Sequence, residues 1–590
     1  MSIFNVFSLF GGLALFLFGM DVMGKGLEKQ AGSRLQVILE KLSARPLRGF
    51  LLGLLVTAVI QSSSATTVMV VGFVNSGVMQ LGQAINVIMG ANVGTTVTAW
   101  ILSLSGLEGD SLWVQLLKPS NFSPILALIG IILYMFFKSS RKKDIGAIML
   151  GFAILMTGMD TMSAAVKPLA DVPQFTQLFL AFQNPILGLL AGAILTGIIQ
   201  SSSASVGILQ ALSATGAVSY GSAIPIILGQ NIGTCVTAMI SSVGTNKNAR
   251  RAALVHLYFN IIGAVGFLGV FTLLKTFVGF SFVDQPINAM GIAVVHTTFN
   301  LLATALMLPF ARGLEKLAYL TIPDQKGEKG EDFALLDERL LATPAVAVEQ
   351  SRKVTLEMAN LSRSSLLRAM SLTETWDDAL AQEVERSEEM VDHFEDVLGT
   401  YLVRLSSRSM TLEDSREVSK LLHTISDFER IGDHAVNVLK AARELHTKGL
   451  SFSSAAKQEL NVLCGAVQDV LDKTVEAFRL EDLAVAAKVE PLEQVVDELT
   501  RELKARHILR LQNGTCTIEL GFIFSDLLNN YERVADHCSN VAVALIEVAQ
   551  DSFDTHEYLA ELKAGDEQFA QRLQKYRTRY TVPASKAEES

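Results

Sequence analysis

The pentapeptide Gln-Ser-Ser-Ser-Ala occurs at residues 61–65 of this 590-residue chain and recurs unchanged 139 residues later, at 200–204. Both copies interrupt apolar stretches of the kind that enter a lipid bilayer. An unsatisfied polar group costs roughly 2 to 7 kcal/mol in hydrocarbon. A chain that twice places three hydroxyls and an amide in such surroundings has a use for them, and we predict that they bind a ligand.

The short apolar segments after the serine runs predict half-length helices that begin at the serines. The first turn of a helix has N–H groups without intrahelical partners and the positive end of the helix dipole. This end stabilises an anion by about 0.3 to 1 kcal/mol when exposed and up to about 2 kcal/mol when partly buried. Two facing tips would add six hydroxyls, from Ser62, Ser63, Ser64, Ser201, Ser202 and Ser203. This chemistry suits a compact oxyanion rich in hydrogen-bond acceptors.

The sequence places no arginine or lysine near either tip, so we expect coupling cations to neutralise the anion. Neutral oxygen ligands of the kind that suit Na⁺ are available from Gln61, Gln200, Asn92, Asn231, Thr95 and Thr234. The last four lie in two Gly-x-Asn-x-Gly-Thr segments, at 90–95 and 229–234. We expect the backbone to open there and offer carbonyls to the cation. Close packing of helices is the alternative use of these glycines.

Other polar residues of the apolar stretches have simpler explanations. Hydroxyls in membrane helices commonly bond their own backbone or a neighbouring helix. Two H-x-x-x-N pairs, His256 with Asn260 and His296 with Asn300, favour a helix–helix hydrogen bond over ligand contact.

Composition divides the chain near residue 312. Charged residues are rare before about residue 310 and dense after it, which indicates a membrane half followed by a soluble half. The net charge of −10 lies mostly in the soluble half and argues against nonspecific binding to nucleic acid. The four cysteines form no C-x-x-C pair and three of them lie in the soluble half, as expected for reduced thiols of a cytoplasmic domain.

The membrane half is a duplication. Gly19-Met20-Asp21 returns as Gly158-Met159-Asp160, and Pro46 returns as Pro185, at the same offset as the serine runs. For the two aspartates, which lie near the ends of spans, we favour interfacial solvation or capping over a binding role.

We expect inverted repeats at about 3–137 and 145–275, followed by a final span to 310. Each repeat should contain one re-entrant hairpin with the serines at its tip and an odd number of crossings, which turns the second copy upside down. Residues 25–45 are expected to form an amphipathic helix in the interface. Basic residues concentrate on one face of the membrane, and by the positive-inside rule that face is cytoplasmic.

Paired QSSS tips, each followed by a G-x-N-x-G-T segment, resemble the sodium-phosphate cotransporter family over nearly the whole membrane half. The resemblance implies that the six serines hold phosphate. It also implies sodium ligands at Gln61, Thr66, Asn92, Thr95, Gln200, Ser205, Asn231 and Thr234. One position departs from the internal repeat, because Cys235 stands where the first copy has Thr96.

The soluble half contains a second duplication, with an offset of 103 residues. Glu429-Arg430-Ile431-Gly432-Asp433-His434 is echoed by Glu532-Arg533-Val534-Ala535-Asp536-His537. Upstream E-x-x-x-D pairs place two carboxylates on one helix face, and several such faces converging in a bundle make an oxygen-rich metal site. The alternative is that these carboxylates are solvated and paired with Arg430 and Arg533.

The pattern of the soluble half resembles PhoU, a tandem pair of three-helix bundles. The resemblance implies a divalent or iron-type metal and a role in phosphate signalling, through a protein partner or a homodimer. The implied metal ligands are Glu388, Asp392, Glu429, Asp433, Glu493, Asp497, Glu532 and Asp536.

We therefore predict an all-α chain: a polytopic membrane transporter domain at 1–312, a linker at 313–342, a PhoU-like domain at 343–560 and a disordered tail at 577–590. The predicted function is Na⁺-dependent transport of inorganic phosphate in the cytoplasmic membrane. A phosphate exporter and a membrane sensor that binds phosphate without turnover are the alternatives. The sequence does not favour an enzyme, because neither tip has a paired base and no phosphate-cradling Gly-Lys-Ser loop is present.

Overall fold

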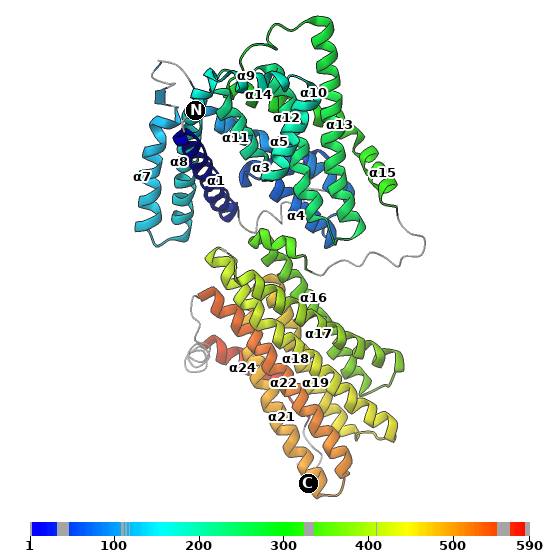
Figure 1. Cartoon of the computed structure of the whole chain (residues 1–590). Helices are drawn as coiled ribbons and strands as arrows, with labels where there is room; N and C mark the ends of the chain where they lie inside the picture. The colour runs from blue at the N-terminus through cyan, green and yellow to red at the C-terminus, as the bar shows by residue number, and fades with distance from the viewer. Residues whose placement is uncertain are drawn as a thin grey trace. The chain divides into compact units, whose positions relative to one another are not determined.

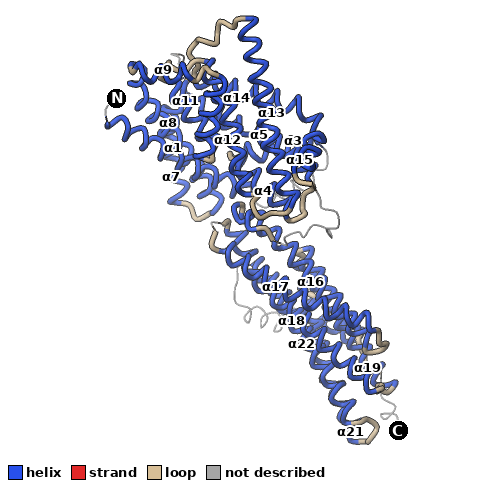
Figure 2. Tube along the Cα trace, turned by 45° about the vertical axis from the view of Figure 1, so that its right-hand side comes forward, coloured by secondary structure: helices blue, strands red, loops and turns tan. Residues whose placement is uncertain are grey.

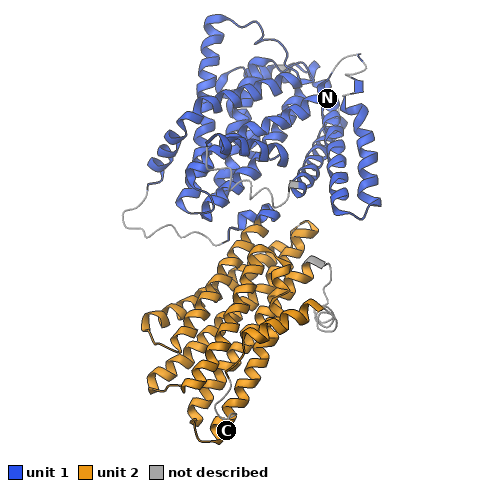
Figure 3. Ribbon diagram, turned by 180° about the vertical axis from the view of Figure 1, so that it is seen from behind, with its two compact units in different colours: residues 1–346 blue, residues 347–590 orange. Residues whose placement is uncertain are grey.

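A computed structural model of the chain describes residues 3–583 except 32–45, 108–110, 112–114, 117, 324–335, 409 and 551–566. The described residues form helices joined by turns and loops (Figure 2). The chain divides into two compact units, residues 1–346 and 347–590 (Figure 3). This division falls within the first turn of a long helix that begins at Pro344.

The α-helices of the first unit are labelled in Figure 1, and the short 3-10 helices (η) lie between them in the chain. They are α1 (Ile3–Ala31), α3 (Pro46–Ile60), α4 (Ser63–Asn75), α5 (Leu81–Ser103), η1 (Leu104–Gly106), α7 (Pro119–Phe136), α8 (Ser140–Val166), η2 (Lys167–Asp171), α9 (Pro173–Ala181), α10 (Pro185–Ile199), α11 (Ser202–Ser213), α12 (Tyr220–Ser241), α13 (Lys247–Val278), α14 (Ala289–Met307), η3 (Leu308–Phe310), α15 (Ala311–Thr321) and η4 (Glu338–Ala342).

Within the described residues, seven helices are long and apolar enough to cross a membrane. The seven candidate spans start at the first residues of α1, α5, α7, α8, α12, α13 and α14, respectively. The shorter apolar helices α3 and α4 are joined at Gln61-Ser62, and α10 and α11 are joined at Gln200-Ser201. The chain is thus a multi-pass membrane protein in which both serine runs lie at breaks between short helices, as predicted.

Glycines hold α1 against α8. A Cβ on Gly19 would lie 2.3 Å from the backbone nitrogen of Leu155, and a Cβ on Gly158 would lie 2.4 Å from that of Phe16. Real Cβ atoms do not approach backbone this closely, so the two helices can pack in this way only where small residues stand. The packing fixes the position of α1 and of the polar face that it carries.

The Gly-x-Asn-x-Gly-Thr segments also serve close packing. A Cβ on Gly90 of α5 would lie 1.9 Å from the carbonyl oxygen of Phe50 on α3. In the second repeat, a Cβ on Gly229 of α12 would lie 1.9 Å from the oxygen of Leu189 on α10. Because α5 and α12 run unbroken through these segments, the expectation of an opened backbone was wrong. The short helix before each tip instead packs directly against a continuous helix.

The expected interfacial helix at 25–45 was also wrong in its first part. Helix α1 continues without a break to Ala31, so residues 25–31 extend the first span. Residues 32–45 lie outside the described part of the chain.

The C-terminal end of α4 is tied to the segment that precedes the second unit. Asn75, the last residue of α4, donates from Nδ2 to the buried carboxylate of Asp337 at 2.8 Å. Asp337 pairs with Arg339 at 3.0 Å, and Arg339 donates to the backbone oxygens of Ser241, the last residue of α12, and of Val243 just after it. Leu340 is fully buried and would be 3.0 Å from a Cβ on Gly72.

The second unit is a tandem of helical bundles. Its helices are α16 (Pro344–Leu372), α17 (Asp378–Ser406), α18 (Leu412–Lys448), α19 (Ser454–Leu480), α20 (Leu483–Ala486), α21 (Val489–Gln512), α22 (Ile518–Gln550) and α24 (Glu567–Arg579). Figure 1 shows α18 and α22, one from each half of the tandem, running side by side. The repeat pairs them reciprocally: His434 Nδ1 lies 2.8 Å from Asn530 Oδ1, and His537 Nδ1 lies 2.9 Å from Asp427 Oδ1.

The expected disordered tail begins within a helix. Helix α24 extends to Arg579, and Arg577 forms a two-pronged pair with Glu498 of α21 at 2.8 and 2.6 Å. Residues 577–583 therefore pack on the bundle, and residues 584–590 lie outside the described part.

Candidate functional site

Both tips begin with a glutamine in a strained backbone conformation. Gln61 and Gln200 have φ values of 62° and 57°, in the left-handed region that favours glycine. Holding a longer side chain there costs of the order of 1 to 3 kcal/mol. The same outlier at equivalent positions of the two repeats shows that the turn belongs to the repeat and that the glutamine side chain is retained despite its backbone cost.

The first serine of each run caps the helix that follows. Ser62 and Ser201 are extended, and their hydroxyls accept hydrogen bonds from the N–H groups of Ala65 at 3.1 Å and Ala204 at 3.2 Å. The backbone therefore turns sharply at each glutamine and starts a helix with its N-terminal amides at the tip.

The two tips line one cavity of about 280 Å³. Its wall includes every residue that was predicted to hold phosphate, together with both glutamines: Gln61, Ser62, Ser63, Ser64, Gln200, Ser201, Ser202 and Ser203. Pockets for drug-sized ligands span about 300 to 1,000 Å³, so this cavity suits a smaller solute. Two helix N-termini and six hydroxyls give it the chemistry of an oxyanion site.

The third wall of the cavity is one face of α1. It contributes Leu17, Met20, Asp21, Gly24, Lys25 and Glu28, spaced three or four residues apart as on a single helix face. Lys25 Nζ lies 2.8 Å from Asp21 Oδ2. The expectation that no lysine lies near the tips was therefore wrong, and Asp21 is ion-paired at a cavity wall.

This error has a physical cause. Lys25 is 36 residues from the first tip in sequence, and only the packing of α1 on α8 brings its face beside the serines. The signal in the sequence was the spacing of Asp21, Lys25 and Glu28 along an apolar helix, because ionisable groups in a membrane span usually face a polar cavity.

The predicted sodium ligands other than the glutamines are absent from the described lining of this cavity. Three of them donate to backbone oxygens in their own helix: Thr95 to Ala91 at 3.1 Å, Thr234 to Gln230 at 3.0 Å, and Asn231 to Ile227 at 2.9 Å. Thr66 is tied to the first tip, since its hydroxyl donates to the Ser62 oxygen at 3.0 Å. These side chains are buried in helices that adjoin the tips.

Two buried acceptors beside the second tip have no hydrogen-bond partner among the described residues. They are the hydroxyl of Ser205, one turn into α11, and the side-chain oxygen of Gln230 on α12. Gln230 Nε2 donates to the Ser205 backbone oxygen at 3.0 Å, so the two groups are neighbours. Buried oxygens without a hydrogen-bond partner are suited to bind a cation, so Gln230 is a further candidate sodium ligand. Comparing the two membrane repeats did not reveal it, because Ala91 occupies the equivalent position in the first repeat.

Asn92 has a partner on another helix. Its Oδ1 lies 3.3 Å from His256 Nε2 of α13. The expected helix–helix hydrogen bond is thereby confirmed for His256. The side chain of Asn260 bonds the His256 backbone oxygen at 3.0 Å, and that of Asn300 bonds the His296 oxygen at 2.9 Å.

The second unit brings six of the eight predicted metal ligands into two clusters. In each cluster the carboxylate oxygens of three residues lie within 4.8 Å of one another. The clusters are Glu388, Asp392 and Asp433, from α17 and α18, and Glu493, Asp497 and Asp536, from α21 and α22. Carboxylates so placed are the hard oxygen donors that divalent cations prefer, so the residues present fit such an ion.

Carboxyl groups in both clusters have raised pKa values. Burial and the charges of Asp392 and Asp433 raise the pKa of Glu388. Burial raises the pKa of Asp536, against the opposing effect of Arg533. The salt bridges that were the alternative to metal binding are also present: Arg430 contacts Asp433 and Arg533 contacts Asp536, each at 3.2 Å.

The two remaining predicted metal ligands, Glu429 and Glu532, are not members of the two clusters. Burial and Asp433 raise the pKa of Glu429, which places its carboxylate within electrostatic reach of the first cluster. Glu532 instead accepts a hydrogen bond from Lys504 at 3.0 Å.

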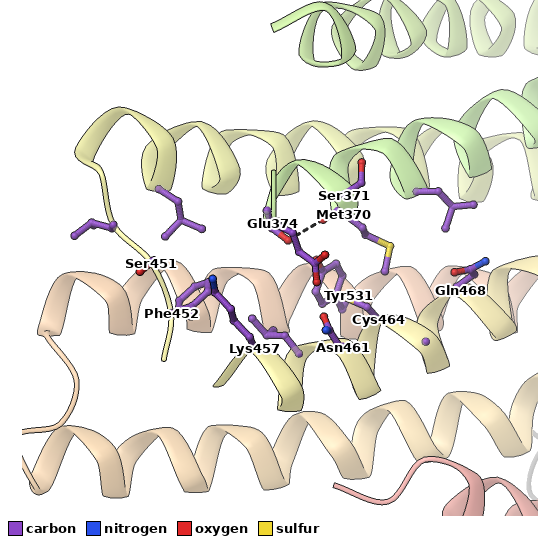
Figure 4. A pocket seen from close by; sticks show the side chains of 16 residues that line it. Met370, Ser371, Glu374, Ser451, Phe452, Lys457, Asn461, Cys464, Gln468 and Tyr531 are labelled. Atoms are coloured by element: carbon purple, nitrogen blue, oxygen red, sulfur yellow. Dashed lines mark hydrogen bonds between the residues drawn. The ribbon is translucent and has the colours of Figure 1, made fainter. Parts of the chain in front are cut away.

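A larger cavity of about 480 Å³ lies within the second unit. Figure 4 shows side chains from several helices meeting there, with Asn461 and Cys464 of α19 near Tyr531 of α22 and Glu374 after α16. Burial raises the pKa of Cys464 to about 12, against the hydrogen bond from Tyr531, so this thiol stays protonated and is a poor nucleophile.

The comparisons with known proteins agree with this division. A sequence model described as Na⁺/Pi-cotransporter matches residues 15–164 and 162–292. A sequence model described as the PhoU domain matches residues 355–442 and 460–545.

Relatives cover either the whole chain or one unit. YjbB of Escherichia coli (strain K12), a protein named for inorganic phosphate export, is 26% identical over 93% of this chain and 99% of its own length. YqeW of Bacillus subtilis (strain 168) is 32% identical over 53% of this chain and 96% of its own length. The crystal structure of PhoU from Pseudomonas aeruginosa aligns with 35% of this chain and 97% of its own, at 24% identity and a TM-score of 0.33. The chain therefore belongs to the Na⁺/Pi-cotransporter family of membrane transporters and carries a PhoU domain after its membrane half.

Proposed function

We propose that this protein moves inorganic phosphate across the cytoplasmic membrane, coupled to Na⁺, by alternating access. The observation that carries the proposal is the single cavity lined by both QSSS tips. Inverted repeats with broken helices that meet at a shared site are the architecture of secondary transporters. The six serines bind phosphate, and the eight predicted sodium ligands, with Gln230 added, supply oxygens for the cation.

The test is phosphate flux into proteoliposomes that contain the full chain. Flux should require Na⁺ and should fall at least about tenfold in Ser63→Ala and in Ser202→Ala, because each loses a donor at the shared site. Ser213→Ala is the matched control, since Ser213 lies at the far end of α11 and donates to its own helix. Equal flux in all three variants would contradict the site assignment.

The direction of net transport is the second question, because YjbB is named for export. Measuring flux both ways under imposed Na⁺ and voltage gradients separates uptake from export. A sensor without turnover would bind radiolabelled phosphate and show no flux in either direction.

We also propose a regulatory role for the PhoU domain on the cytoplasmic side of the membrane, a side that the positive-inside rule supports. The contacts of Asp337 and Arg339 support a physical route for this regulation. They tie the segment that leads into the PhoU domain to the end of α4, and the opposite end of α4 is a serine tip.

A further inference from the structure

The charged face of α1 is unusual for a membrane span. Helix α1 is apolar enough over residues 3–30 to cross a bilayer, yet Asp21, Lys25 and Glu28 all line the serine cavity. Charged groups within a span are costly and generally mark the path of a charged substrate. The mechanism proposed above uses none of these three side chains.

The geometry of the pair between Lys25 and Asp21 allows exchange of partners. The two atoms are 2.8 Å apart, while the side chains are 64% and 53% exposed. Because more than half of each side chain is uncovered, both ends of the pair can be reached by another partner. Glu28 lies on the same face, and one of its carboxylate oxygens is buried without a hydrogen-bond partner among the described residues.

We propose that Lys25 contacts phosphate in the loaded site and exchanges Asp21 for a phosphate oxygen. In the empty cavity the Asp21 carboxylate holds the ammonium. When phosphate binds, Lys25 forms a charge-assisted hydrogen bond to it, and the released Asp21 carboxylate attracts the coupling Na⁺. This inference rests on the phosphate-transport function proposed above and adds a linked pair of charges to its site.

The pair also distinguishes the two repeats. The backbone of the two tips is the same, but the position equivalent to Lys25 in the second repeat is Ala164, whereas Asp21 has its equivalent in Asp160. Among the described residues that line the cavity, the basic counter-charge is therefore supplied from the α1 side alone. It breaks the symmetry of an otherwise duplicated site.

The first experiment compares Lys25→Gln and Lys25→Arg with Lys29→Gln in the full chain. Lys29 is the matched control, since it lies one turn further along α1 and is not among the cavity-lining residues. Two readouts are taken: equilibrium binding of radiolabelled phosphate to the detergent-solubilised protein, and the phosphate concentration that gives half-maximal flux in proteoliposomes.

We expect Lys25→Gln to raise the dissociation constant for phosphate and the phosphate concentration for half-maximal flux by about tenfold each. This is the effect of losing one charge-assisted hydrogen bond. Lys25→Arg keeps the charge and should stay within about twofold of the unsubstituted protein. Lys29→Gln should change neither. If Lys25→Gln and Lys29→Gln give the same curves, the inference is wrong.

The second experiment tests the linkage through Asp21→Asn. Phosphate binding should not weaken, because Lys25 stays available, while the Na⁺ concentration for half-maximal flux should rise. A merely structural role for the pair would instead weaken binding of both ions equally. If the unsubstituted protein neither binds nor moves phosphate, the proposed function fails. If it does both and needs Ser63 but is indifferent to Lys25, only the present inference fails.

Discussion

At the scale of single residues, the most informative positions are Gln61 and Gln200, because each combines a backbone cost with a side chain in the cavity. Glycine would adopt their φ values of 62° and 57° without strain. The Gln61 amide accepts a hydrogen bond from the Thr98 hydroxyl at 2.9 Å and donates to the Ala58 backbone oxygen, so packing within the protein offsets part of its backbone cost. The Gln200 side chain forms no such bond among the described residues, and its strain of about 1 kcal/mol or more points to a function of its amide.

We predict that Gln200→Gly leaves the full chain as stable as before, or more stable by about 1 kcal/mol, and abolishes most of the phosphate flux. Thermal unfolding in detergent and flux in proteoliposomes measure the two effects. Glu481→Gly is the control, because Glu481 also has a positive φ, of 52°, but lies in the PhoU domain. Retained flux in Gln200→Gly would show that the amide is dispensable.

At the scale of elements, α4 connects two features that are far apart in sequence. Its first turn is a serine tip, and its last residue, Asn75, bonds Asp337. The contact with Asp337 and the serine tip therefore stand at opposite ends of one helix. The glycine contacts of α3 with α5 hold the helix that precedes this tip close to a continuous helix.

We predict that Asp337→Ala releases the segment 336–342 from α4. The change leaves Asn75 Nδ2 and Arg339 without this acceptor, and an unsatisfied buried donor costs about 1 to 3 kcal/mol. Hydrogen exchange should rise over 336–342 and at the C-terminal end of α4. Glu338→Ala, at the exposed neighbouring position, should leave exchange unchanged. Equal exchange in the two variants would show that the Asp337 contacts do not hold the segment.

The docking of α24 should depend on pH. The Arg577 guanidinium lowers the pKa of Glu498 below its usual 4.5. A carboxyl group with a lowered folded pKa contributes stability above its usual pKa and loses it as pH falls through the folded pKa. We therefore expect α24 to become more accessible to protease under acid conditions below that range.

A variant checks the cause of this dependence. Glu498→Gln should expose α24 at neutral pH, whereas Glu502→Gln should not, because Glu502 pairs with Arg506 on its own helix. Proteolysis that is independent of pH in the unsubstituted protein would contradict the role of this pair.

At the scale of the whole molecule, two duplications of different kinds stand in one chain. The membrane repeats converge on one shared cavity, so a lesion in either copy is expected to cripple the same site. The PhoU repeats instead form two separate acidic clusters. Each should therefore hold its own cation, and loss of one should leave the other.

We predict that the double variant Glu388→Gln with Asp392→Asn lowers the divalent or iron-type metal content of the purified full chain by about half, because only one of two clusters is lost. Metal analysis after dialysis measures this content. Glu383→Gln, on the same helix α17 but paired with Arg368, is the control. Equal metal content in both proteins would favour the Arg430 and Arg533 pairings as the role of these carboxylates.

The sequence by itself determined the helical class, the change in composition from an apolar half to a charged half, both duplications and the recurrence of the serine runs. These properties follow from composition, periodicity and repeated residue types, which are local along the chain. Tertiary structure decided that α5 and α12 stay unbroken, that their glycines serve packing, and that Lys25 joins the serine cavity. Each of these depends on which helix lies against which. A glycine offers the same backbone freedom to an opened turn as to a close crossing, and only the neighbouring helix determines which of the two occurs.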